Sequence, residues 1–306
     1  MQYRFRFLLW GLAFILSGAQ VSTVFARAPS TAKIVFASTR DGNSEIYIMN
    51  PDGSEQENLT RHPSRDLAPV WSPTGEHIAF HSHRDGTRDI YIMDANGKNV
   101  RKVFRRLAYR EYPVWSPDGK KLAYTSASNW SIYVGTIEGG HEERITSTNF
   151  LGGWPTWSPD SSEIAFIFTE GPWADSLKVF NLETREERIL MPKEEIGKFL
   201  DPDWSPDGTR IVFYWSKKGI YVIDRNGRGL RRLVSNASRP VWSSLGDELV
   251  YGKKQQLFKY NLNSRRSKQL THGAINFDAD WFDPQVLPVQ PQTSLLTTKW
   301  ATIKQR

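Results

Sequence analysis

Short apolar runs alternate with polar turns along most of this chain. In the stretch 77–94, for example, Ile78-Ala79-Phe80 is one run, Arg84-Asp85-Gly86 has the composition of a turn, and 89–93 alternates polar and apolar residues. Runs of this length predict β-strands, and the Gly- and Asp-rich pieces between them predict tight turns. The pattern therefore predicts an all-β protein.

A tryptophan opens each repeat of this pattern. Close copies of the sequence Trp-Ser-Pro-Asp-Gly start at four positions, and a degenerate copy and a last fragment follow them: Trp71, Trp115, Trp157, Trp204, Trp242 and Trp281. The steps between successive tryptophans are 44, 42, 47, 38 and 39 residues. A period of about 40–45 residues with four short strands is that of a β-propeller blade.

The interior of each repeat is also regular. The residue seven after each of the first five tryptophans is Ile or Leu, and the residue nine after it is Phe or Tyr. Because positions two apart on a strand share a face, we expect these residues and the tryptophans to pack between neighbouring blades. Tryptophans that stack on a ligand, as in sugar binders, are the alternative, but a fixed place in a core pattern favours packing. Asp118, Asp160 and Asp207 lie in turns of different blades and are interpreted as turn residues rather than metal ligands.

Five complete repeats and two partial ones predict six blades. The first strand, 33–38, has no tryptophan before it, and Trp281 has no strand after it. We expect the segment around 278–281 to supply the inner strand of the blade that 33–60 begins, which closes the ring and removes free sheet edges. The predicted fold is an all-β six-bladed propeller of four-stranded antiparallel blades, within residues 29–284.

The two ends of the chain lie outside the repeat. Residues 1–28 carry Arg4 and Arg6, then an apolar run, then small residues, which is the pattern of a secretory signal peptide. The run is short for a membrane span of about 20 residues, so an uncleaved anchor is the weaker alternative and no stable span is expected after cleavage. Residues 285–306 are rich in Pro, Gln and Thr and predict an extended tail. Its apolar residues around Trp300 either dock on the propeller or form a recognition segment.

Composition narrows the class of protein. The 306 residues include no cysteine, which excludes disulfides and a lipid anchor on an N-terminal cysteine. The formal charge is +7, and removal of residues 1–28, with three arginines and no acid, leaves +4. Because lysines and arginines are spread over many turns rather than gathered on one element, a nucleic-acid partner is not expected.

The repeats resemble those of a known family. Pro-x-Trp-Ser-Pro-Asp-Gly-x-x-Ile-Ala-Phe, followed by Arg-Asp-Gly and Ile-Tyr-x-Met-Asp, is similar to the WD-like repeat of the TolB-type six-bladed propeller, over roughly residues 33–284. This resemblance implies an exported propeller. TolB proteins carry an additional α/β domain before the propeller, whereas only a few residues separate the predicted signal peptide from the first strand here. Prolyl oligopeptidase-like peptidases carry similar propellers, but this sequence has no Gly-x-Ser-x-Gly motif.

Candidate binding residues come from the segments that lead into the Trp-bearing strands. Those strands are expected to be innermost, so their leading segments lie at the mouth of the central channel. These positions do not repeat, and they mix charged and aromatic side chains, as a partner-binding surface requires. Unconstrained variation of loop residues is the alternative. The predicted mouth residues are Arg65, Asp66, Arg110, Glu111, Tyr112, Trp154, Asp201, Arg239 and Asp278.

The sequence gives less support to a catalytic function than to partner binding. His81 and His83, two apart on a predicted strand, are the pair that could ligate a metal, but no third ligand is evident and exposed strand histidines are the simpler interpretation. Some sugar lyases that resemble this propeller hold a channel metal with several histidines, a pattern not seen here.

The sequence as a whole predicts a monomeric, non-enzymatic protein of the bacterial periplasm or exterior. We expect it to bind a protein or peptide partner at the channel mouth without cofactor or metal. A metal-dependent polysaccharide lyase or hydrolase that uses the channel is the alternative.

Overall fold

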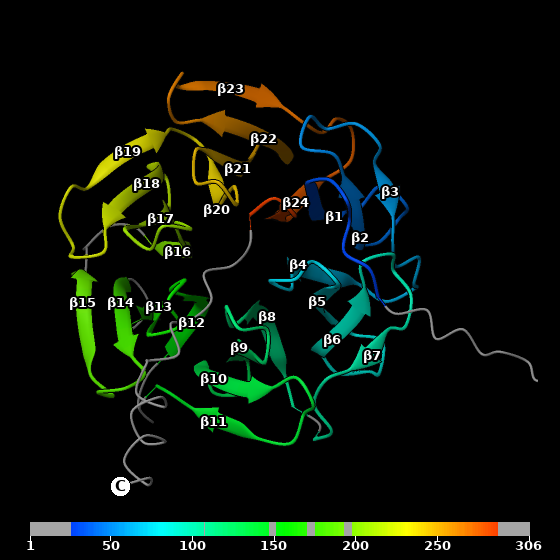
Figure 1. Ribbon diagram of the computed structural model, residues 1–306, viewed down its shortest axis with the longest axis horizontal. Coiled ribbons are helices and arrows are strands. Elements are labelled where there is room, and N and C mark those ends of the chain that lie inside the picture. The colour runs from blue at the N-terminus through cyan, green and yellow to red at the C-terminus, as the bar shows by residue number, and fades with distance from the viewer. Residues whose placement is uncertain (1–25, 107, 147–150, 170–174, 193–197, 287–306) are drawn as a thin grey trace, which may run out of the picture.

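Twenty-four strands form six four-stranded antiparallel sheets arranged around a central axis (Figure 1). The structure, a computed structural model, describes residues 26–286 except 107, 147–150, 170–174 and 193–197. Every regular element within these residues is a strand. The predicted all-β six-bladed propeller is therefore confirmed.

The blades are numbered along the chain, and the strands of each are given from the channel outward. Blade 1 contains β24 (Asn276–Phe282), β1 (Lys33–Ser38), β2 (Glu45–Met49) and β3 (Glu57–Asn58). Blade 2 contains β4 (Asp66–Trp71), β5 (His77–Ser82), β6 (Asp89–Asp94) and β7 (Arg101–Lys102). Blade 3 contains β8 (Arg110–Trp115), β9 (Lys121–Ser126), β10 (Ser131–Thr136) and β11 (Glu142–Arg144).

The second half of the ring repeats this order. Blade 4 contains β12 (Leu151–Trp157), β13 (Glu163–Thr169), β14 (Asp175–Asn181) and β15 (Glu187–Met191). Blade 5 contains β16 (Phe199–Trp204), β17 (Arg210–Trp215), β18 (Gly219–Asp224) and β19 (Arg231–Val234). Blade 6 contains β20 (Ser238–Trp242), β21 (Glu248–Lys253), β22 (Gln256–Asn261) and β23 (Arg266–Gln269).

Blade 1 closes the ring, because its inner strand comes from the far end of the described chain. β24 pairs antiparallel with β1, with Trp281 opposite Ile34 and Asn276 opposite Ser38. This pairing covers an edge of β1 that would otherwise be free. The predicted closure is confirmed.

One hydrogen-bonded arrangement makes the turn after the inner strand. In blade 3, Oγ of Ser116 donates to Oδ1 of Asp118 at 2.6 Å and accepts the main-chain N–H of Lys121 at 2.9 Å. Gly119 has a φ of +71°, which glycine adopts without strain. The same Ser–Asp bond occurs in blades 4 and 5. The repeated aspartates are therefore turn residues, as predicted.

Six apolar clusters hold the propeller together, and each is shared by two neighbouring blades. Between blades 1 and 2, for example, Val35 and Ile46 pack with Trp71, Ile78 and Phe80. The first five repeat tryptophans are between 4% and 9% exposed, so they are core residues rather than platforms for a ligand. The predicted contact between blades is confirmed.

The Arg-Asp-Gly turns have a structural role as well. In blade 2 the guanidinium of Arg84 lies 5.1 Å from the ring centre of Phe80 and 5.0 Å from that of Tyr91. The Tyr91 hydroxyl donates to the carboxylate of Asp85 in the same turn. The turn around Arg40 in blade 1 has the same two contacts, so both Arg-Asp-Gly turns are fastened to their own blade by a cation–π contact and a hydrogen bond.

The ends of the chain fall largely outside the described part. The predicted signal peptide of residues 1–28 is described only from residue 26, and the predicted tail of 285–306 only as far as Val286. No helix in the described part of the chain is long and apolar enough to cross a bilayer. The strands run from Lys33 to Phe282, and the domain limits of 29–284 stay a prediction.

Candidate functional site

Every inner strand carries a β-bulge at one mouth of the channel. In each blade the register shifts around one residue of left-handed backbone conformation, with φ between +48° and +55°. Such φ values are uncommon outside glycine, and bulges re-aim side chains beside functional sites. We name these six residues the mouth ring: Ala68, Tyr112, Trp154, Asp201, Arg239 and Asp278.

A proline follows the mouth-ring residue in five of the six blades, and Ala279 follows it in blade 1. Proline has no N–H group to donate, so within a sheet it is tolerated at an edge strand or a bulge. Both conditions hold here, because each inner strand is the channel-side edge of its blade. The backbone thus fixes the ring positions while their side chains differ.

The mouth ring surrounds a cavity of about 260 Å³ on the channel axis. All six ring residues line it, together with the five bulge prolines and the side chains of Asp203 and Asp280. A concave wall that is mostly apolar, with a few converging polar groups, is typical of a binding site.

One side of the mouth ring is aromatic. The rings of Tyr112 and Trp154 lie 5.5 Å apart at an angle of 37°. Their main-chain N–H groups are paired with the preceding blades: that of Tyr112 donates to Nδ1 of His81 at 3.4 Å, and that of Trp154 donates to Oγ1 of Thr125 at 3.2 Å. Because both bulges are held in this way, the two rings form a positioned wall of the cavity.

The other side of the mouth ring is charged. Nε of Arg239 lies 3.1 Å from Oδ1 of Asp278, and the Arg239 side chain is 46% exposed while that of Asp278 is 16% exposed. Burial raises the pKa of Asp201 to about 7 and also raises the pKa of Asp278, against the lowering effect of the Arg239 charge. The charge on this side therefore changes near neutral pH.

Two further carboxyl groups lie deeper in the channel, two residues after a ring position. Oδ2 of Asp203 accepts the main-chain N–H of Trp242 at 2.8 Å, and Oδ2 of Asp280 accepts that of Trp71 at 2.6 Å. Burial raises the pKa of Asp203 to about 7 and that of Asp280 to about 6. Sequence reasoning missed both, although the shared spacing Asp-x-Asp-Trp at 201–204 and 278–281 was a signal that could have found them.

The other predicted mouth residues lie beside the channel rather than in it. Three of them are buried at the start of inner strands: Asp66, Arg110 and Glu111. Each forms an ion pair with a residue of a nearby strand or turn. In one of these pairs, Nη1 of Arg110 lies 3.0 Å from Oδ1 of Asp89. Arg65 is exposed and does not line the channel cavity. The structure thus brings together five of the nine predicted residues: Tyr112, Trp154, Asp201, Arg239 and Asp278.

The two candidate metal-ligating histidines have different environments and different hydrogen-bond partners. His81 is 3% exposed, not an exposed strand residue as expected, and burial lowers its pKa to about 3. His83 lies past the end of β5, where its Nε2 accepts a hydrogen bond from Nε of Arg88 at 3.1 Å. Within the described ranges, no group of three or more His, Cys, Asp or Glu side chains is placed to hold a metal ion.

Known proteins share both the repeat and the fold. The sequence model of the family described as the TolB beta propeller domain matches residues 16–150 and 112–285. The Tol-Pal system protein TolB of Geobacter sulfurreducens is 49% identical over 49 residues, which are 16% of this chain and 11% of that protein. The chain therefore aligns with only a small part of this curated relative.

Solved structures of TolB have the same architecture. That from Acinetobacter baumannii superposes with a TM-score of 0.71 at 18% identity, covering 82% of this chain and 66% of that one. A putative TolB from Agrobacterium tumefaciens gives a TM-score of 0.66 at 19% identity, covering 81% of this chain and 91% of that one. The superpositions establish a common fold. The family match over both halves of the repeat array shows that the chain belongs to the TolB β-propeller family.

Proposed function

We propose that this protein is a non-enzymatic binding protein of the bacterial cell envelope that holds an extended segment of a protein partner at the mouth ring. Membership of the TolB β-propeller family supports an envelope role, because the curated relatives are named as Tol-Pal system proteins. The proposal names the chemistry of the partner and not its identity, since those alignments cover only 11% and 12% of the relatives.

The observation that carries the proposal is the division of the mouth ring into an aromatic and a charged side. Tyr112 and Trp154 offer an apolar face for a side chain, and aromatic residues of this kind dominate binding energies in protein interfaces. Arg239 and its neighbouring carboxyl groups offer donors and acceptors for main-chain amides. A cavity of about 260 Å³ admits an extended chain rather than a folded domain.

The remaining expectations belong to the same proposal. Residues 1–28 would direct export to the periplasm or beyond, and the propeller would act as a monomer. No cofactor and no nucleic acid would take part.

A metal-dependent lyase or hydrolase is not favoured by any arrangement in the described part of the chain. The required ligands would have to converge in the channel. The buried carboxyl groups of Asp203 and Asp280 instead accept main-chain hydrogen bonds between blades, and His81 has the same role for Tyr112.

Site-directed photocrosslinking in the producing cells tests the proposal. A photoreactive phenylalanine analogue at Tyr112 keeps an aromatic ring in the mouth. The matched control carries the same analogue at Leu245, which is 68% exposed in the turn after the inner strand of blade 6, at the opposite end of that strand. We expect one protein to be crosslinked from position 112 and not from position 245. Recovery of no protein, or of the same proteins from both positions, would contradict binding at the mouth ring.

A further inference from the structure

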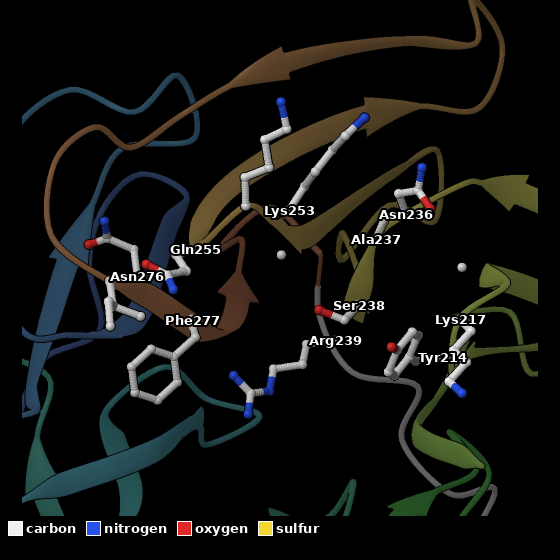
Figure 2. Close-up of a pocket in the computed structure, with 14 residues that line it drawn as sticks. Tyr214, Lys217, Asn236, Ala237, Ser238, Arg239, Lys253, Gln255, Asn276 and Phe277 are labelled. Carbon is white, nitrogen blue, oxygen red and sulfur yellow. The ribbon is translucent and has the colours of Figure 1, made fainter. Parts of the chain in front are cut away.

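A second cavity opens beside the mouth ring, where blades 5, 6 and 1 meet (Figure 2). Its volume is about 340 Å³. Four segments form it, together with Tyr214: the hairpin around 217–219, the segment 236–239 before and into β20, the turn around 252–255, and residues 275–277 at the start of β24. Figure 2 shows Ser238 and Tyr214 among the side chains that line it.

The lining of this cavity is strongly cationic. Lys217, Lys253, Lys254 and Arg239 contribute to it, and no aspartate or glutamate does. The three lysines form no ion pair with any residue that the structure describes. In Figure 2 the ammonium groups of Lys217 and Lys253 point away from Ser238, and their long, flexible side chains can turn toward a bound anion. Arg239 is paired with Asp278, so the three lysines supply the excess positive charge, and such an excess favours an anionic group.

Hydrogen bonds and close packing hold the backbone around this cavity in place. Lys254 and Gln255 occupy the two central places of the β21–β22 turn, with φ values of +50° and +62°. The carbonyl of Gln255 accepts the main-chain N–H of Asn276 at 2.9 Å, which ties this turn to blade 1. On the opposite wall, a Cβ at Gly219 would lie 2.2 Å from the carbonyl oxygen of Val234, so the β17–β18 hairpin packs directly on the strand β19. A preformed site of this kind costs little ordering when a ligand binds.

This cavity is continuous with the mouth ring. A connecting cavity of about 310 Å³ shares Tyr214, Ser238 and Arg239 with it, and shares the ring residues Tyr112 and Trp154 with the channel cavity. Arg239 lines all three cavities. A single extended chain can therefore lie across the aromatic side of the ring and continue into the cationic hollow.

We propose that this cationic hollow, where blades 5, 6 and 1 meet, binds the carboxylate of an acidic residue. The same protein segment that occupies the mouth ring carries that residue. This inference rests on the proposed function and specifies the chemistry of its partner. Charge-assisted hydrogen bonds from Arg239 and the lysines would hold the carboxylate, with the Ser238 and Tyr214 hydroxyl groups as further donors. Continuity with the Tyr112–Trp154 wall favours a peptide over a lipid headgroup or a free anion.

Selection from a random peptide display library on the full chain tests this inference. We expect the selected peptides to share an aromatic or large apolar residue and, at a constant spacing from it, Asp or Glu. A synthetic peptide of the selected sequence should lose about tenfold or more in affinity with the double variant Lys253→Glu, Lys254→Glu. The neutral double variant Lys253→Gln, Lys254→Gln should lose less.

A second pair of lysines provides the matched control. Lys98 and Lys120 are exposed in turns of blades 2 and 3 and line none of the three cavities. Their reversal to Glu changes the net charge by the same amount and should leave the affinity for the peptide within about twofold. Equal loss in both reversed proteins would mean that only the overall charge matters, which would overturn the inference.

The outcomes separate the hollow from the mouth ring. Peptides whose binding requires Trp154 but which carry no shared acidic residue would overturn the hollow as a carboxylate site and leave the proposed function standing. Binding to phosphatidylglycerol vesicles that is lost on Lys253→Glu, Lys254→Glu, with no peptide selected, would identify a lipid surface and overturn the inference as well. Absence of selected peptides together with absence of a photocrosslinked partner would remove the proposed function itself.

Discussion

The main-chain N–H of Trp71 donates a 2.6 Å hydrogen bond to Oδ2 of Asp280. This bond joins the inner strand of blade 2 to β24, the strand that closes the ring. Asp203 makes the equivalent bond to Trp242 between blades 5 and 6. Both carboxyl groups are surrounded by protein at the channel wall, so their negative charge is costly there even though each accepts a donor.

Asp280→Asn should make the stability of the protein less dependent on pH. Burial raises the pKa of Asp280 to about 6 from the usual 3.8, so its protonated form is favoured by folding. Its contribution is therefore fully present below pH 3.8 and is lost as the pH rises through about 6. Since one pKa unit corresponds to about 1.4 kcal/mol, we expect the variant to gain about 1–3 kcal/mol relative to the wild type between pH 4 and pH 7.

Urea unfolding at these two pH values measures the difference. Asp52→Asn is the control, because this exposed aspartate lies in an outer turn of blade 1. A loss of stability for Asp280→Asn that is the same at both pH values would show that the charged carboxylate is the better partner for the Trp71 N–H group.

His81 should have the opposite pH dependence. Burial lowers its pKa to about 3 from 6.5, and its neutral Nδ1 accepts the N–H of Tyr112. The stability that it contributes is present above pH 6.5 and is lost as the pH falls toward 3, because the unfolded chain binds the proton first. Threonine is the informative substitution, since Thr125 takes the equivalent position in blade 3 and accepts the main-chain N–H of Trp154 in blade 4.

The variant His81→Thr keeps an acceptor but cannot titrate, so we expect its free energy of unfolding to fall less than that of the wild type between pH 6.5 and pH 4.5. His81→Leu leaves the Tyr112 N–H unpaired and should cost about 1–3 kcal/mol more than His81→Thr at pH 7. Unfolding curves at the two pH values distinguish the three proteins. Parallel pH dependence for the wild type and His81→Thr would contradict a buried neutral histidine.

Gly75 of blade 2 contacts Phe282 of blade 1, and this contact predicts a large cost for a single methyl group at Gly75. A Cβ at Gly75 would lie 2.2 Å from Cζ of Phe282, whose ring packs at 5.5 Å from that of Trp71. Gly86 has a similar φ, +80° against +70°, but open space around it. Gly86→Ala should therefore cost only the backbone strain, about 1–3 kcal/mol, and Gly75→Ala should cost clearly more.

Thermal unfolding of the two alanine variants compares the costs directly. The Gly75→Ala protein should recover part of its stability when Phe282→Leu is added, because the smaller side chain makes room for the methyl group. Equal destabilisation by Gly75→Ala and Gly86→Ala would mean that Phe282 moves aside without cost.

The fold was predictable because its information is periodic. The Trp position occurs six times and the strand pattern that follows it occurs five times, so blade number, closure and interfaces all follow from one template. The mouth-ring positions were predictable for the same reason, since each lies three residues before a tryptophan.

The roles of individual charged residues were not predictable, because their partners are on other strands. Arg110 belongs to the leading segment of an inner strand, yet it pairs with Glu142, 32 residues away, and with Asp89 in blade 2. His81 accepts a hydrogen bond from a residue 31 positions away. The cationic hollow is assembled from four segments of blades 5, 6 and 1, which meet only where these blades pack together. No local pattern reports such pairings.

Trp154 should be the largest single contributor to partner binding in the mouth ring. It has a wide apolar face, and the hydrogen bond from its main-chain N–H to Oγ1 of Thr125 fixes its position. Aromatic side chains at the centre of an interface carry much of the binding energy. Trp154→Ala should weaken binding of a selected peptide about 10–100-fold, measured by calorimetry. Trp130→Ala is the matched control, because Trp130 is 42% exposed and lines none of the cavities. Equal effects of the two substitutions would argue against the ring as the binding surface.

Binding should also strengthen on mild acidification. The charged side of the ring contains one arginine and two carboxyl groups, and burial raises the pKa of Asp201 to about 7 and raises that of Asp278. At pH 8 the ionised carboxylate of Asp201 offsets Arg239, whereas at pH 6 Asp201 is mostly protonated and Arg239 is less compensated. An acidic peptide should therefore bind several-fold more tightly at pH 6 than at pH 8. Asp201→Asn should show the tighter binding at both pH values, because its side chain is neutral throughout. An affinity for the wild type that is constant between pH 6 and pH 8, or a variant that keeps the full pH dependence, would contradict this role of Asp201.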